Sequence, residues 1–327
     1  MATGTKQVRV PLSTRLKVWW EGYDMAEVEA RMLAMEKRKA LSQPKPDPAP
    51  PPPLNEDLPV APWDNRRIEV AQYIWGDGYC GPGGPEYVIA MSKLLALSPK
   101  MSALVLGAGL GGPSRVLAQE FGVWITGVEE SEPLANAGME LSVRSGMAKK
   151  APIRHYNPEN PVEFERNFDR AFAKEALFTV RNKKALVKQV TQKLKPDSLF
   201  LIVDYFLAEP GMALNADLLA WKEKERETPY LVTGDDMVDL LEDSGFVVRV
   251  NEDISEQYAD MIAKAWAEAD KVVTTLLEQG EEGRQLVDVL MHEAEHWFAR
   301  SRLLQAGVLQ ARRILGTKKV TKTLSDW

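Results

Sequence analysis

The sequence predicts an α/β fold in which a mostly parallel sheet is covered by helices on both faces. One observation is the unit Ser102 to Glu130, where an apolar run, a glycine-rich turn, a helix-like segment and a second apolar run follow one another. The other is a second unit, Phe168 to Phe206, with the same order of strand, helix and strand. Strands that alternate with helices are typical of parallel sheets.

The first predicted strand, Ala103 to Leu106, is continuously apolar, as expected for a strand buried on both faces. The turn after it is rich in glycine, which allows a sharp bend and a close approach of the backbone to a ligand. Pro113 then suits the first turn of a helix. The predicted ligand-binding turn consists of Gly107, Ala108, Gly109 and Gly111, followed by Gly112.

The second predicted strand, Val123 to Val128, delivers Glu129 and Glu130 to the same edge of the sheet. A carboxylate at this place accepts hydrogen bonds from the two hydroxyls of a ribose. We therefore predict that the glycine turn and these two acids bind a cofactor that contains a nucleoside.

Two cofactor classes fit this unit. Gly107, Gly109 and Gly112 match the dinucleotide fingerprint G-x-G-x-x-G, and Glu129 follows at the expected distance of about twenty residues. Gly107, Gly109 and Gly111 equally match the G-x-G-x-G turn of enzymes that use S-adenosylmethionine. The glycines alone leave a nicotinamide or flavin oxidoreductase open beside a methyltransferase.

The second unit resembles the class I S-adenosylmethionine-dependent methyltransferases. A strand from Phe168 to Ala173 leads into a helix that includes Leu177 and Val180. The turn Lys195 to Ser198, which overlaps the motif Leu194-Lys-Pro, then leads to the strand Leu199 to Val203. These enzymes commonly have such a helix and an LKPGG-like turn between their fourth and fifth strands. The resemblance spans residues 75–319. It implies a Rossmann-like sheet with an antiparallel last strand at 308–315, S-adenosylmethionine as cofactor and no metal.

A narrower resemblance lies in residues 73–87, which are rich in glycine and aromatic residues. They are similar to the lid that folds over the cofactor in small-molecule N-methyltransferases of the phosphoethanolamine and sarcosine/dimethylglycine type. The resemblance implies cofactor contacts from Tyr73, Gly83 and Gly84, and catalytic roles for Tyr73 and Tyr79. In that family a histidine often contacts the lid tyrosine. This chain has Thr179 there, so the contact is absent or rebuilt, which disfavours a phosphobase substrate.

Further site residues follow from the ends of strands and from the same resemblance. Lys174 and Glu175 end the fourth strand, where ligands bind in such sheets; we predict that Lys174 contacts the cofactor and that Glu175 is catalytic. Asn157, after a third strand over 153–156, offers an acceptor for the adenine amino group. The predicted substrate contacts are Trp75, Trp221, Tyr230 and His292. Glu175, Tyr79 and His292 all stay open as the general base.

The remaining elements follow from capping and periodicity. Helices are predicted over 131–145, 233–244, 255–279 and 284–305, and a substrate-pocket insert over about 207–230. Thr233 caps the second of these helices, because two acids follow it in the first turn.

His292 and His296 belong to the sequence H-E-A-E-H, which matches the zinc motif H-E-x-x-H. A third protein ligand is required. No histidine or glutamate follows His296, so we expect scaffold and not a metal centre.

Composition limits the function classes. A length of 327 residues with 45% hydrophobic residues suits one α/β core with an appendage. The formal net charge of −6 disfavours a nucleic-acid binder, which needs a basic face. The single cysteine, Cys80, excludes an intrachain disulfide and favours the cytoplasm. The chain has no apolar run of about eighteen residues, so we expect a soluble protein.

Three segments are predicted along the chain: a helical arm (1–42), a proline-rich linker (43–62) and the catalytic domain (63–327). The arm carries tryptophans among basic residues, so we expect it to pack on its own or a neighbouring catalytic domain, with a homo-oligomer or a membrane surface as the partners left open. The predicted function is in-line transfer of a methyl group to N, O or S of a small acceptor. The alternatives are an inactive assembly subunit and an oxidoreductase.

Overall fold

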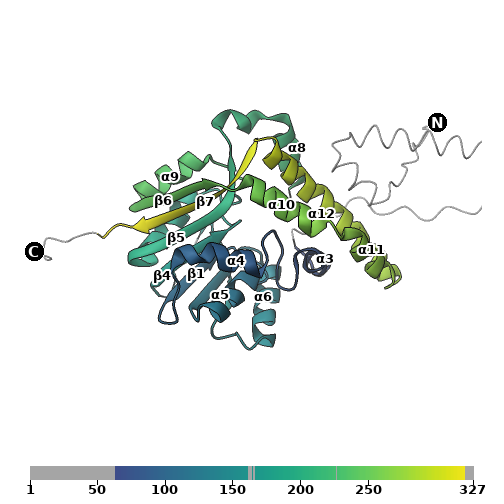
Figure 1. Cartoon of the computed structure of the whole chain (residues 1–327), viewed down its shortest axis with the longest axis horizontal. Coiled ribbons are helices and arrows are strands. Elements are labelled where there is room, and N and C mark those ends of the chain that lie inside the picture. The colour runs from purple at the N-terminus through teal and green to yellow at the C-terminus, as the bar shows by residue number, and fades with distance from the viewer. Residues whose placement is uncertain (1–62, 161–163, 165, 226, 321–327) are drawn as a thin grey trace, which may run out of the picture.

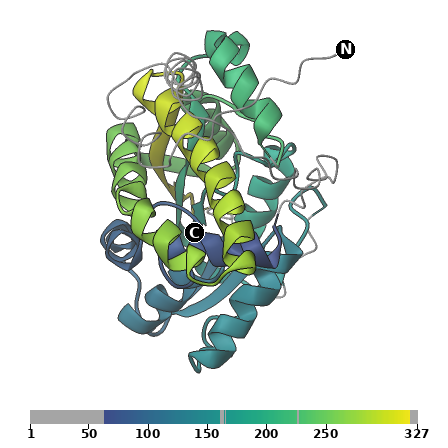
Figure 2. The ribbon, with the colours of Figure 1, turned by 90° about the vertical axis from the view of Figure 1, so that its right-hand side faces the viewer.

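The computed structural model describes residues 63–160, 164, 166–225 and 227–320. The predicted arm and linker lie outside the described residues. Within them the chain forms one seven-stranded sheet with helices on both faces (Figures 1 and 2). The strands are β1 (Ser102–Leu106), β2 (Trp124–Glu129), β3 (Ile153–His155), β4 (Phe168–Lys174), β5 (Leu194–Leu207), β6 (Phe246–Asp253) and β7 (Leu309–Lys318).

The sheet order is β3-β2-β1-β4-β5-β7-β6. The first five strands are parallel to one another, whereas β7 runs antiparallel to both β5 and β6. This confirms the predicted sheet with its antiparallel last strand. The order also separates the fold from the dinucleotide-binding order 3-2-1-4-5-6, because β7 is inserted between β5 and β6.

The helices before β4 are α3 (Asn65–Trp75), α4 (Pro85–Ser92), α5 (Gly112–Glu120) and α6 (Glu132–Arg144), with a short 3-10 turn η1 (Lys93–Leu95). Those after it are α7 (Lys183–Lys193), α8 (Ala216–Lys224), α9 (Gly234–Asp243), α10 (Ser255–Trp266), α11 (Ala269–Leu277) and α12 (Glu281–Gln305), with the 3-10 turn η2 (Pro210–Leu214). Ser131 caps α6, and Thr233 forms a capping box with Asp236 at α9.

Alternation along β1 divides the core between the two faces of the sheet. Ala103 and Val105 pack with residues of α4, α10 and α12, whereas Leu104 and Leu106 pack with residues of α7 and α9. All four side chains are buried. Successive side chains of a strand point to opposite faces, so an apolar residue at every position is what a doubly covered strand requires.

The helix predicted over 255–279 is two helices. α10 ends at Trp266 and α11 begins at Ala269, and both residues are buried. At the junction the backbone hydrogen bonds span three residues instead of four: the amide of Ala267 donates to the carbonyl of Lys264, and that of Lys271 to the carbonyl of Glu268. A break at this point lets Trp266 and Ala269 both pack against the core. The pattern of apolar and polar residues in the segment is compatible with one continuous helix, so the sequence did not reveal the break.

The segment between β4 and β5 also differs from the prediction. α7 begins at Lys183 after the cap Asn182, so Leu177 and Val180 belong to a buried loop and not to the helix. The predicted turn at Lys195 to Ser198 lies inside β5, where the pairing register with β4 shifts and Asp197 takes a φ of 58°. A bulge absorbs the extra residues without ending the strand.

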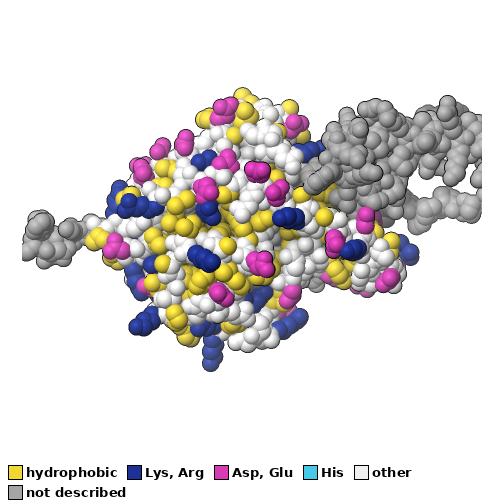
Figure 3. Space-filling model, in the orientation of Figure 1, with side chains coloured by type: hydrophobic (Ala, Val, Ile, Leu, Met, Phe, Trp, Pro, Cys, Tyr) yellow, Lys and Arg dark blue, Asp and Glu magenta, His cyan; other side chains and the backbone are white. Residues whose placement is uncertain are grey.

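The surface of one face is mixed in character. In Figure 3, hydrophobic side chains gather near the centre, over α4 and the adjoining strands, and charged side chains of both signs surround them. Among the described residues, no helix combines the length and the apolar character needed to cross a bilayer.

Candidate active site

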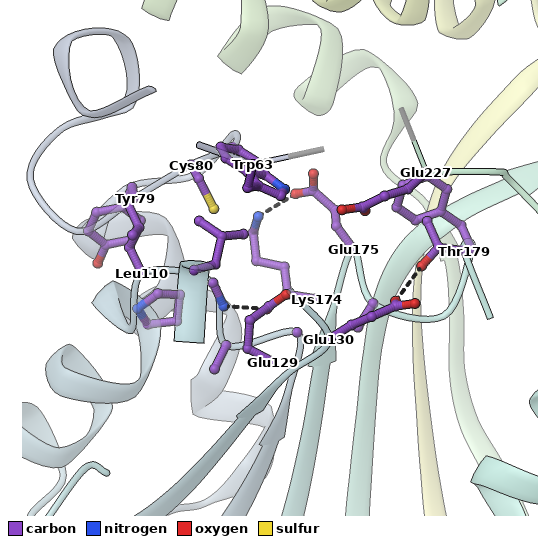
Figure 4. Close-up of a pocket in the computed structure, with 18 of the residues that line it drawn as sticks. Trp63, Tyr79, Cys80, Leu110, Glu129, Glu130, Lys174, Glu175, Thr179 and Glu227 are labelled. Atoms are coloured by element: carbon purple, nitrogen blue, oxygen red, sulfur yellow. Dashed lines mark hydrogen bonds and ion pairs between the residues drawn. The ribbon is translucent and has the colours of Figure 1, made fainter. Parts of the chain in front are cut away.

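A pocket opens at the carboxyl ends of β1, β2 and β4, where ligands bind in open parallel sheets. It is bounded by the glycine turn, the lid segment and α12 (Figure 4). The predicted site residues that line it are Tyr79, Gly107, Ala108, Gly109, Glu129, Glu130, Lys174 and Glu175. The structure therefore brings together groups that are up to about a hundred positions apart in sequence.

Close packing fixes the glycine turn. Gly107 and Gly109 have φ values of 66° and 53°, in the left-handed region that favours glycine. A Cβ on Gly107 would lie 2.5 Å from the Cβ of Ala176, and one on Gly109 would lie 2.8 Å from the Sγ of Cys80. Side chains at these two positions would thus collide with the β4 loop and with the lid.

Glu129 ends β2 with its carboxylate held by backbone amides. Its Oε2 accepts from the amide of Gly109 at 2.8 Å, and its Oε1 accepts from the amide of Ser131 at 2.9 Å. Burial raises the pKa of Glu129 to about 7, although both hydrogen bonds oppose the shift. Each carboxylate oxygen keeps acceptor capacity for a ligand.

Glu130 lies beside Glu129 and contacts the loop after β4. The hydroxyl of Thr179 donates to its Oε2 at 3.4 Å. Burial raises the pKa of Glu130, and the charge of Glu227 adds to that rise. Thr179, which replaces the family's histidine, thus contacts an acid of the pocket.

Lys174 and Glu175 form an ion pair at the end of β4. Glu175 also accepts from the hydroxyl of Tyr258 at 3.3 Å and from that of Tyr205 at 3.5 Å. Its φ of 50° places a non-glycine residue in the left-handed region, a strain that is often found at functional sites. The surrounding hydrogen bonds hold this carboxylate in one position.

Three pocket residues come from α12, which sequence reasoning did not assign to the site as a group. They are His296, Trp297 and Arg300. Arg300 donates to Glu225 Oε1 at 2.8 Å, and its Nη2 lies 3.1 Å from His296 Nε2. His296 itself lies 3.3 Å from the same Glu225 oxygen. Glu225 and Glu227 follow α8, so the predicted insert does contribute to the pocket.

Aromatic rings surround the Arg300 guanidinium. Its Cζ lies 4.8 Å from the ring centre of Tyr205 and 4.7 Å from that of Trp297, with Phe178 and Trp221 slightly farther away. Burial disfavours its charge, but Glu225, Tyr205 and Glu175 together outweigh burial and hold the pKa of Arg300 above its usual value. The available sequence signal was an arginine close to one tryptophan and one phenylalanine, Trp297 and Phe298, on the same helix.

The lid segment places its two predicted tyrosines differently. Tyr79 is buried against the start of α5 and lines the pocket, and burial raises its pKa to about 12. Tyr73 is 39% exposed and accepts a hydrogen bond from Gln279, outside the pocket lining. Gly83 and Gly84 also lie outside the lining of the pocket. Gly84 is the N-cap residue of α4.

Other predicted contacts lie around the pocket and not in its lining. Trp75 packs edge-on against Trp297 at 4.7 Å, and Trp221 is buried beside Arg300. The ring of Tyr230 is 39% exposed, and its amide donates to Phe178. The residues outside the lining are Tyr73, Gly83, Gly84, Gly111, Trp75, Asn157, Trp221, Tyr230 and His292.

The residue after β3 that reaches the pocket is Tyr156. Asn157 is exposed, and its side-chain oxygen accepts from the amide of Glu159 at 2.9 Å in a local turn. An asparagine that binds its own loop in this way is common in turns. The predicted adenine contact at this place therefore has Tyr156 as a nearer candidate.

The H-E-x-x-H segment is part of α12, and its last residue, His296, lines the pocket. His292 is exposed, Glu293 is buried and accepts from Arg67 Nε at 2.8 Å, and His296 faces Glu225. Among the described residues, no group of three or more histidine, cysteine or acidic side chains is placed to hold a metal ion.

Gly112 allows the lid to contact α5, and its replacement by alanine tests that contact. The new Cβ would lie 2.5 Å from the Gly78 carbonyl oxygen and 2.8 Å from Tyr79 Cε2. We expect Gly112→Ala to lower the free energy of unfolding by about 1–3 kcal/mol, as overpacking does. Urea unfolding measures this, with Gly211→Ala as control, since a Cβ there meets nothing nearer than 3.9 Å. Equal stability of the two variants would contradict the contact.

A family model described as a methyltransferase domain matches residues 86–250 of the chain. That range contains the glycine turn, Glu129 and the ion pair after β4. It is half of the chain, and it covers the part of the sheet that forms the cofactor side of the pocket.

The chain is also similar in sequence to two methyltransferases. The chain is 27% identical over 204 residues to the phosphoethanolamine N-methyltransferase of Plasmodium falciparum, covering 61% of this chain and 74% of the relative. It is 23% identical over 213 residues to that of Triticum aestivum, covering 64% of this chain and 41% of the relative. The chain therefore spans less than half of the length of the wheat protein.

A solved structure has the same fold. Phosphoethanolamine N-methyltransferase 2 of Haemonchus contortus, in complex with S-adenosyl-L-methionine, aligns with a TM-score of 0.67 and 19% sequence identity. The alignment covers 78% of this chain and 57% of that one.

Proposed function

The chain belongs to the methyltransferase domain family, and from this membership we propose that it transfers the methyl group of S-adenosylmethionine to a small organic acceptor. The acceptor atom is N, O or S. The family and the sheet order favour this over the oxidoreductase alternative, because β7 is inserted where dinucleotide-binding sheets have none.

One observation carries the proposal. The carboxylate of Glu129 lies at the end of β2, hydrogen-bonded to the glycine turn, in a pocket that continues to Glu175, Trp297 and Arg300. Such a carboxylate suits the two hydroxyls of a ribose. The pocket therefore offers a nucleoside site beside Glu129, and we assign the part lined by Phe178, Trp297 and Arg300, called the second compartment, to an acceptor.

The residues present fit the proposed cofactor. Gly107 and Gly109 bring bare backbone to the pocket, and Tyr156 and Leu134 supply apolar surface for a base. S-adenosylmethionine supplies an activated methyl group on a cationic sulfur, which a nucleophile attacks in line. The protein then has to position the acceptor and exclude water, which contributes much of the rate enhancement in such reactions.

Aromatic side chains and buried polar groups do that positioning. Phe178 and Trp297 line the second compartment, and the Lys174–Glu175 pair fixes its border with the glycine turn. Tyr205 and Tyr258 hold Glu175 from the other side. Since Glu175 lines the pocket and is held rigidly, we propose it as the residue that orients the acceptor or accepts its proton.

The first experiment is calorimetric titration of the full chain with S-adenosylmethionine, S-adenosylhomocysteine and NADH. We expect the first two to bind and NADH not to bind. Transfer of a labelled methyl group to a panel of amines, alcohols and thiols follows. Binding of NADH alone would overturn the proposal, and cofactor binding without transfer to any acceptor would favour the inactive-subunit alternative.

The pKa of Glu129 predicts a pH dependence of cofactor binding. In the free protein this pKa is about 7, and hydroxyl donors of a ribose favour the ionised carboxylate. Binding should therefore release a proton, and affinity should rise as the pH increases through 7, by roughly tenfold between pH 6 and pH 8. Titrations in two buffers of different ionisation enthalpy measure the proton release. A Glu129→Gln variant should show a flat profile, and an unchanged slope would contradict the assignment.

The arm's role in a homo-oligomer or at a membrane surface stays a prediction, as does the cytoplasmic location. The location is supported by the single cysteine, Cys80, because disulfides are rare in that compartment.

A further inference from the structure

The charges of the pocket are unevenly matched. The described lining holds three side chains with a permanent positive charge and five carboxylates. The cationic residues are Arg67, Lys174 and Arg300, and the acidic residues are Glu129, Glu130, Glu175, Glu225 and Glu227. This balance bears on which acceptor the second compartment can hold.

Each of the three cations already contacts a carboxylate. Arg300 donates to Glu225 at 2.8 Å, and Arg67 donates to Glu293 at 2.8 Å. Lys174 is paired with Glu175. A phosphate would have to share these cations with the carboxylates that already neutralise much of their charge, which weakens its attraction to the pocket.

The faces of the arginines are covered as well. Arg67 lies 3.7 Å from the ring centre of Trp63, and the Arg300 guanidinium lies within 5 Å of the Tyr205 and Trp297 ring centres. The Arg300 Nε has no acceptor among the described residues, but it is fully buried. The Nη2 of Arg300 is bonded to Glu225 and its Nε is buried, so Arg300 forms part of the wall of the pocket.

Three carboxylates of the described lining, Glu129, Glu130 and Glu227, form no ion pair with these cations, and backbone amides hold Glu129. Glu130 accepts one hydrogen bond from Thr179, and Glu227 lies close enough to raise the pKa of Glu130 by its charge. In Figure 4 both come from the side of the pocket opposite Cys80 and Tyr79. A positive ligand would relieve their mutual repulsion, whereas an anion would increase it.

The aromatic walls suit a cation with apolar substituents. Trp63, Phe178 and Trp297 line the pocket, and each also contacts the guanidinium of Arg67 or Arg300. Aromatic faces attract alkylated ammonium groups through their quadrupoles. The paired cations and the aromatic walls both favour a positively charged ligand over an anionic one.

We propose that the acceptor is a small cationic amine without a phosphate group, held between the aromatic walls and the Glu130–Glu227 side of the pocket. The inference rests on the proposed methyl transfer and names its substrate class. It separates this chain from the phosphobase chemistry after which the similar phosphoethanolamine N-methyltransferases are named.

The reaction balances with one proton released per turnover. The bound ammonium first loses a proton to a carboxylate or to water, which frees the nitrogen lone pair. That pair forms the new N–C bond while the C–S bond breaks, and both of its electrons stay on sulfur. The methylated amine leaves as a cation.

A matched pair of ligands tests the inference. The full chain is saturated with S-adenosylhomocysteine and titrated with N-methylethanolamine, and separately with its phosphate ester, phosphomonomethylethanolamine. We expect the amine to bind at least tenfold more tightly than the ester. Tighter or equal binding of the ester, or no binding of the amine, would overturn the inference.

A charge variant and its control localise the effect. Glu227→Gln should weaken amine binding severalfold and leave S-adenosylhomocysteine binding unchanged. Glu223→Gln removes an exposed carboxylate of α8 outside the pocket and should change neither. If S-adenosylhomocysteine itself does not bind, the proposed function fails. If it binds and the ester is preferred, only the inference about the acceptor fails.

Discussion

Glu129→Ala should weaken the binding of S-adenosylmethionine by at least about a hundredfold. The substitution removes a carboxylate that we assign to both ribose hydroxyls, and each charge-assisted hydrogen bond contributes about 1.5–3 kcal/mol. It also releases the amides of Gly109 and Ser131, which the carboxylate holds in the free protein. The glycine turn would then lose its preformed shape, which adds to the loss of affinity.

Calorimetric titration of the wild-type chain and the variant measures this effect. Glu132→Ala is the matched control, because Glu132 is an exposed acid in the first turn of α6 and does not line the pocket. Its affinity should equal that of the wild type. Retention of near wild-type affinity by Glu129→Ala would place the ribose elsewhere.

Arg300→Met should lower the free energy of unfolding by about 3–5 kcal/mol, the cost of leaving a buried carboxylate without its partner. Arg300 is 4% exposed and donates to Glu225, whose side chain is 5% exposed. The aromatic rings around Arg300 limit the access of water, so water does not solvate the Glu225 carboxylate after the guanidinium is removed. Methionine fills much of the same volume, which limits the contribution of a cavity.

The double variant Arg300→Met/Glu225→Leu separates charge from packing. With both charges removed, the stability should recover most of the loss, because buried ion pairs are often replaceable by apolar groups. Urea unfolding of the wild type, both single variants and the double variant gives the coupling between the two residues. A double variant as unstable as Arg300→Met would show that the guanidinium acts through packing against the rings.

The cofactor side of the pocket was predictable because its signals are local. The glycine turn and Glu129 lie within one strand-turn-helix-strand unit, and a carboxylate at the end of β2 has few directions in which to point. Lys174 ends β4 and Glu175 follows it directly, and parallel strands bring their carboxyl ends to one edge. The fold class followed from the same alternation of elements.

The acceptor side was predicted less well because its residues meet across the chain. Arg300 and His296 reach Glu225 from α12, more than seventy positions away. Tyr73 and Tyr79 looked alike in the lid segment, yet one lies on the exposed side of α3 and the other is buried on α5. Tyr156 and Asn157 differ by one position, and the local turn decided which side chain reaches the pocket.

The sequence by itself determined the strands, the glycine turn and the acid that follows β2, because periodicity and backbone freedom are properties of short segments. Only the tertiary structure decided where β7 inserts, that 255–279 is two helices, and which cations of the pocket are neutralised. These depend on contacts between distant segments, whose partners no short segment specifies. The charge that a ligand meets in the pocket is therefore a property of the folded chain.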